Sequence, residues 1–135
     1  NVYEKYYEKM QTPSTPSIPH MFGLKYVLEQ IEEEGLENRW MRHIENARFT
    51  QNWAKDRGQS LFPEEGFESP TITCIQNDRE WDINRINDQL LERGFRMDRG
   101  YGKLRRKAFR IAHMGNVIKD DLIEYLNNFD EVLND

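Results

Sequence analysis

The sequence predicts an α+β domain, with a small, mostly antiparallel sheet and helices packed on one face of it. Segments with helical spacing of apolar residues alternate with short runs typical of strands, and glycines separate most of them. The chain is 135 residues long, of which 37% are hydrophobic and 12% aromatic, so it is long and apolar enough for one domain with its own core.

The first part of the chain is expected to form three helices. Residues 1–11 space three tyrosines and a methionine three or four positions apart, which predicts a short helix with one apolar face. Residues 12–19 hold three prolines and should be extended and stiff, because proline restricts itself and its predecessor. Helical spacing then returns, and we expect one helix from residue 18 to Gly35 and another from about residue 36 to Gly58.

Three short runs are predicted to be strands. The run "TITCI" at 71–75 is rich in β-branched residues, and a second strand, "KAFRIAHMG", is expected over 107–114. A shorter strand is predicted at 95–97. Cys74 alternates with Ile72 in the first run, and we expect it to be a buried core thiol.

Two further helices lie between and after these strands. Asp82 is a suitable N-cap for a helix that Gly94 ends. The last helix is predicted over 119–133, and its core-facing residues are expected to be Leu122, Leu126, Phe129 and Val132.

Composition and charge argue against several functional classes. The net charge of −5 disfavours a general nucleic-acid-binding protein, and no apolar run approaches the roughly 20 residues of a membrane span. With Cys74 as the only cysteine there is no internal disulfide, which suits a reducing compartment, and we expect a cytoplasmic protein. The three histidines, His20, His43 and His113, lack the spacing of metal ligands, so no metal site is expected.

Basic residues are concentrated between residues 93 and 110. This segment holds eight arginines and lysines and one acid, Asp98. One interpretation is a free-standing binding module that uses this basic segment, with Tyr101 available for stacking. The interpretation that we favour is a solvated loop and strand edge that offsets the acidic helices.

Arg110 is unusual within that segment because apolar residues surround it in "KAFRIAHMG". A partly buried guanidinium generally has a carboxylate or phosphate partner. The partner is either an acid of this chain, in an internal ion pair, or the carboxylate of a ligand. The residues alone leave both alternatives open.

Four ordered motifs resemble one protein family. "TPSTPSIP", "EEGLENRWMRH", "LFPEEGFESPTIT" and "KAFRIAHMG" together look like the C-terminal part of class V aminotransferases of the alanine–glyoxylate and serine–pyruvate type, and the match covers nearly the whole chain. The resemblance implies the aspartate-aminotransferase-like fold (fold type I) and pyridoxal phosphate as cofactor. It also implies that residues 1–16 are an arm from the large domain and that 17–135 form the small domain.

The resemblance also implies roles for individual residues. Arg110 is expected to bind the α-carboxylate of the amino-acid substrate, and Thr15 and Thr12 the cofactor phosphate, at a site shared between the subunits of a homodimer. The family's cofactor lysine lies upstream of these motifs. The 135 residues would therefore contain no catalytic residue and be inactive alone, as part of an enzyme that transfers an amino group from an amino acid to a 2-oxo acid.

One loop departs from the family pattern. Relatives usually have a glycine-rich "GGQG" before the strand, whereas this chain has "RGYG", with Arg99 and Tyr101 at the differing positions. Arg106 and Ala112 also stand where relatives often have glycine. We expect the fold and cofactor to survive these changes and the preference for substrate side chains to differ.

Overall fold

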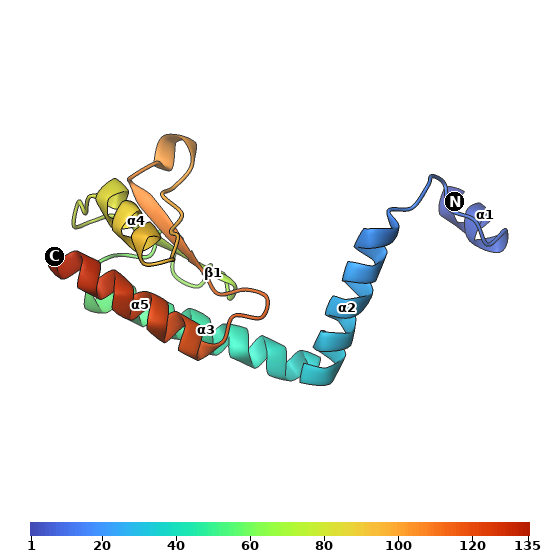
Figure 1. Ribbon diagram of the computed structural model, residues 1–135, viewed down its shortest axis with the longest axis horizontal. Helices are drawn as coiled ribbons and strands as arrows, with labels where there is room; N and C mark the ends of the chain where they lie inside the picture. The colour runs from blue at the N-terminus through green and yellow to red at the C-terminus, as the bar shows by residue number, and fades with distance from the viewer. The chain divides into compact units, whose positions relative to one another are not determined.

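The computed structural model describes all 135 residues, which divide into two compact units, Asn1–Arg39 and Trp40–Asp135 (Figure 1). The first unit holds α1 (Val2–Glu8), α2 (Ile18–Glu34) and the start of α3 (Leu36–Asp56). These are the three helices that the sequence predicts, and they are confirmed. The division into an arm at residues 1–16 and a small domain at 17–135 stays a prediction.

Local signals explain where the helices of the first unit begin and end. The Asn1 side chain accepts the Tyr3 backbone N–H at 2.8 Å and caps α1. Gly35 ends α2 with φ at +83°, a conformation that glycine adopts without strain. Neither α1 nor α2 has a buried residue, and large apolar side chains such as Phe22 and Tyr26 are exposed. The first unit thus carries apolar surface that it does not cover itself.

The second unit contains the sheet. After α3 the chain forms β1 (Ile72–Gln76), α4 (Ile83–Glu92), the 3-10 turn η1 (Gly102–Leu104), β2 (Ala108–Ala112) and α5 (Lys119–Asn134). The two strands pair antiparallel, with Cys74 opposite Arg110. The predicted strands at both positions are confirmed, and β2 is shorter than its run of apolar residues.

The two faces of the sheet differ in burial, as alternation along a strand requires. Ile75, Phe109 and Ile111 join the hydrophobic core with residues of α3, α4 and α5. All the helices of the core lie on this face, so the predicted fold class is confirmed. Cys74 and Arg110 lie on the opposite face and are only half-buried. The prediction of a core thiol is therefore wrong, because the alternation of β1 buries Thr73 and Ile75 instead.

The core is centred on α5. The four residues predicted to face inward from this helix are all buried, which confirms its orientation. Phe129 is fully buried, and its ring lies 5.0 Å from that of Trp53 and 5.9 Å from that of Phe109 between centroids. In Figure 1 α5 runs alongside α3. Asp130 of α5 accepts hydrogen bonds from the Trp53 indole of α3 and from the guanidinium of Arg57, which follows α3.

The segment between α4 and β2 differs from the prediction. Asp82 caps α4 as expected, since its side chain accepts the N–H groups of Asn84 and Arg85. Residues 95–97 do not form a strand. Just after these residues an isolated bridge joins Asp98 to β2, in which the Arg110 N–H donates to the Asp98 carbonyl at 3.3 Å, and a second one joins Arg105 to Ala108. Gly100, with φ at +77°, then turns the chain away before pairing can extend.

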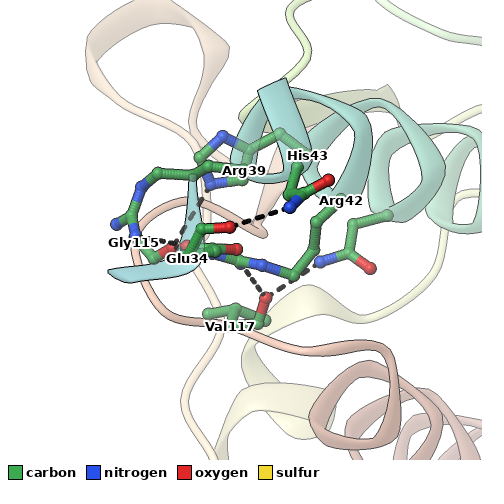
Figure 2. Close-up of polar contacts among 8 residues, drawn as sticks. Glu34, Arg39, Arg42, His43, Gly115 and Val117 are labelled. Atoms are coloured by element: carbon green, nitrogen blue, oxygen red, sulfur yellow. Dashed lines mark hydrogen bonds and ion pairs between the residues drawn. The ribbon is translucent and has the colours of Figure 1, made fainter. Parts of the chain in front are cut away.

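Side chains of α3 hold the loop that follows β2, as Figure 2 shows. Arg42 donates to the carbonyls of Val117 at 2.7 Å and Gly115 at 3.1 Å, and Asn46 donates to Val117 at 3.0 Å. The His43 ring lies 3.2 Å from the Gly115 carbonyl oxygen. These bonds fix the C-terminal end of β2 relative to α3.

His113 follows β2 and is fully buried. The Nε2 atom of its ring lies 2.9 Å from the Thr73 hydroxyl, and its backbone N–H donates to the Thr71 carbonyl at 3.0 Å. Burial, with a smaller contribution from His43, lowers its pKa from 6.5 to about 4. The ring is therefore neutral in the folded protein at pH 7.

Acid is expected to destabilise the chain through His113. Between about pH 6.5 and 4 the unfolded chain binds a proton that the folded one does not, so stability falls as the pH is lowered through this window. The contribution is about 3 kcal/mol at most. Urea unfolding at pH 7, 5.5 and 4.5 measures it. His113→Gln should flatten the dependence, whereas His20→Gln, at an exposed histidine, should leave it unchanged. Equal slopes in all three proteins would contradict this.

No helix is both long and apolar enough to cross a membrane. No group of three or more His, Cys, Asp or Glu side chains comes together as a metal-binding cluster.

Candidate functional site

The candidate site surrounds the side chain of Arg110, on the face of β2 that points away from the core. The Arg110 side chain is 42% exposed, and that of Asp98 is 40% exposed. Arg110 Nε donates to Asp98 Oδ1 at 3.1 Å, and Nη2 donates to Oδ2 at 2.5 Å. The guanidinium therefore has a carboxylate of this chain on one of its edges. This is the internal ion pair that the sequence left as one of two alternatives.

The loop that carries Asp98 is tightly constrained. The Gly100 N–H donates to Asp98 Oδ1 at 2.9 Å, and the Arg106 N–H donates to the Arg99 carbonyl at 2.9 Å. A Cβ on Gly100 would overlap the carbonyl oxygens of Ala108 and Leu104. Glycine is thus required here by its positive φ and by the close approach of the backbone. One oxygen of the Asp98 carboxylate is thus held by a backbone N–H as well as by the guanidinium.

Each partner stabilises the charged form of the other. Hydrogen bonds from Arg110 hold the pKa of the Asp98 carboxyl below its usual range, and Asp98 raises the pKa of the Arg110 guanidinium. Burial raises the pKa of the thiol of Cys74, the residue of β1 that is paired with Arg110. Asp98 and Arg110 are therefore both charged at neutral pH, and Cys74 is a protonated thiol.

A pocket of about 440 Å³ adjoins the ion pair. Phe95, Val117, Leu122 and Tyr125 line its apolar part, and Arg96, Asp98, Arg110 and Asp121 its polar part. Burial raises the pKa of the Tyr125 hydroxyl, so this group stays protonated. A ligand that enters this pocket therefore meets two guanidinium groups, two carboxylates and an apolar wall.

Thr12 and Thr15 lie in the other unit, in the irregular segment between α1 and α2. Both residues are exposed, and neither hydroxyl makes a hydrogen bond within the chain. Both hydroxyls can therefore donate hydrogen bonds to a group from outside this chain. The two threonines belong to the first unit and Arg110 to the second.

The basic segment divides into paired and unpaired residues. Arg93 forms ion pairs with Glu131 and Asp135 of α5. Arg96, Arg99 and Arg105 line a second, more polar hollow of about 740 Å³. The pairing of Asp98 with Arg110 was not predicted from the sequence. The only signal that could have indicated it is that Asp98 is the one acid of this segment.

The chain is similar to aminotransferases over most or all of its length. It is 36% identical over 115 residues to an uncharacterised aminotransferase of Methanocaldococcus jannaschii, which is 84% of this chain and 30% of that protein. It is 33% identical over 139 residues to the serine–glyoxylate aminotransferase of Arabidopsis thaliana, which is 100% of this chain and 34% of that protein. No known family profile matches the chain.

Solved structures agree with the sequence relatives. An alanine–glyoxylate aminotransferase from Nostoc sp. matches 98% of this chain and 36% of its own, with a TM-score of 0.84 and 29% identity. Pyridoxamine–pyruvate aminotransferase from Mesorhizobium loti matches 91% of this chain and 32% of its own, with a TM-score of 0.81 and 26% identity. The chain thus spans about a third of these proteins. They give no support to a free-standing binding module.

Proposed function

We propose that this chain, which is homologous to the C-terminal portion of alanine–glyoxylate and serine–glyoxylate aminotransferases, completes the active site of a pyridoxal-phosphate-dependent aminotransferase. The match to the serine–glyoxylate enzyme over the whole chain carries the proposal. The partly exposed guanidinium of Arg110 at the edge of a pocket supports it, because an amino-acid substrate always presents a carboxylate.

Within such an enzyme, Arg110 binds and orients the substrate. Asp98 uses one edge of the guanidinium, and Nη1 makes no hydrogen bond within the chain. Two parallel hydrogen bonds from the free edge to a carboxylate would fix the substrate's orientation as well as its position. The apolar wall beside it would exclude water from the small side chains of substrates such as alanine or serine.

Thr15, and with it Thr12, would donate hydrogen bonds to the cofactor phosphate. Their exposed, unpaired hydroxyls lie on a segment stiffened by prolines, which limits the entropy lost on binding. The cofactor, when bound, supplies the electron sink that allows an amino group to move from an amino acid to a 2-oxo acid. We further propose glyoxylate or pyruvate as the acceptor, a homodimer in which the segment 12–16 serves the neighbouring subunit, and a cytoplasmic location.

The function is tested by comparing this chain with the longer enzyme of which we propose it is the C-terminal part. The longer enzyme should transfer the amino group of L-serine or L-alanine to glyoxylate. The 135 residues alone should not, and after dialysis they should keep no absorbance from added pyridoxal phosphate, because most of the cofactor's contacts are missing. Cofactor retained at one defined lysine of this chain would contradict the proposal.

A further inference from the structure

We propose that Asp98 is a positioning residue for substrate binding, which holds the guanidinium of Arg110 by its Nε–Nη2 edge and leaves the Nη1 edge for the carboxylate of the substrate. This inference rests on the proposed function of Arg110. It assigns a role to Asp98, which lies in the loop where this chain departs from the family pattern.

The donors of the guanidinium divide between the two carboxylates. Asp98 takes the Nε hydrogen and one Nη2 hydrogen, in the side-on arrangement. Both Nη1 hydrogens and the second Nη2 hydrogen remain. One hydrogen on each of these two nitrogens forms the end-on fork that accepts a second carboxylate. Asp98 therefore need not leave when a substrate binds.

Asp98 is held independently of the side chain that it orients. Its Oδ1 accepts the Gly100 N–H at 2.9 Å, and its carbonyl accepts the Arg110 backbone N–H at 3.3 Å. Gly100 lies so close to the carbonyl oxygens of Ala108 and Leu104 that a Cβ would overlap them, so this loop packs directly on the start of β2. A carboxylate that is hydrogen-bonded to one edge of a long side chain restricts its rotamers before the ligand binds. Less side-chain entropy is then lost when the ligand binds.

Stability alone does not account for the pair. Both side chains are about two-fifths exposed, and ion pairs with this degree of exposure contribute little to folding. The pair nevertheless has bidentate geometry and a third hydrogen bond from Gly100. This arrangement fits orientation of the Arg110 guanidinium toward the pocket that both side chains line.

The test uses Asp98→Ala in the longer enzyme. We expect KM for the amino acid to rise about threefold to tenfold, the range that ordering one flexible side chain is worth, with kcat within about twofold. Calorimetric titration with acetate, a carboxylate that cannot react, should show the same loss of affinity. Asp88→Ala is the matched control, because Asp88 lines the adjacent hollow without contacting Arg110, and it should change neither value.

Comparison with Arg110→Lys separates this inference from the function on which it rests. If Asp98 acts through Arg110, Asp98→Ala should add little to the KM of Arg110→Lys in the double variant. If Arg110→Lys raises KM while Asp98→Ala leaves it unchanged or lowers it, Asp98 is a spectator or a competitor, and only this inference is overturned. If Arg110→Lys itself changes neither KM nor acetate binding, the proposed function of Arg110 fails first.

Discussion

Arg110→Lys in the longer enzyme is expected to weaken recognition of the amino-acid substrate by about 1.5–3 kcal/mol. Lysine keeps the positive charge, but its ammonium group lacks the planar fork that can serve Asp98 on one edge and a substrate carboxylate on the other. Stability should change little, because the ion pair with Asp98 is about two-fifths exposed. Cofactor affinity should also change little, since other residues, Thr15 among them, are proposed to hold the phosphate.

The measurement combines kcat/KM for the amino acid with a thermal melting curve of the same protein. Arg105→Lys is a suitable control, because Arg105 lies in the same loop and makes no hydrogen bond with Asp98 or Arg110 through its side chain. A large fall in Tm with unchanged kcat/KM would show that Arg110 serves the fold and not the substrate.

Phe129→Ala is expected to lower the free energy of unfolding by about 3–5 kcal/mol. The Phe129 side chain is fully buried, and besides Trp53 and Phe109 its ring contacts Trp81 at 5.9 Å and Tyr125 at 6.1 Å between centroids. Its removal leaves a cavity behind Phe109, the neighbour of Arg110 in β2. The substitution therefore also weakens the packing of β2, the strand that contains Arg110.

Urea unfolding of the 135-residue chain measures this change. Phe129→Leu should cost less, because it fills most of the cavity, and Phe67→Ala should cost almost nothing, because Phe67 is 79% exposed. If Phe129→Ala and Phe67→Ala had equal effects, the aromatic cluster would not be the centre of the core.

The helices could be predicted because their signals are local. Asp82 caps α4, Gly35 ends α2, and the spacing of apolar residues in α5 identifies the buried face of that helix. Each of these depends on hydrogen bonds and side-chain neighbours within a few positions of the chain. The resemblance to aminotransferases could also be found from the sequence alone, because it depends on short motifs in a fixed order.

The partner of Arg110 could not be predicted, because it depends on how distant segments meet. Asp98 lies twelve positions before Arg110 in the chain. A strand at 95–97 would have set the direction of the Asp98 side chain through pairing with β2, but the structure has only an isolated bridge at Asp98. The prediction that Cys74 is buried in the core was wrong for a related reason. Which face of a two-stranded sheet is buried depends on where the helices pack, and the run "TITCI" has at least one apolar side chain on each face.

By itself, the sequence determined the helices, the two strands, the kinship with aminotransferases and the need of Arg110 for an anionic partner. Only the tertiary structure decided that the partner within the chain is Asp98 and that the pair is half-exposed beside a pocket. Periodicity and capping are properties of neighbouring residues. The distance between two charges and their exposure to water are set by the packing of the whole unit.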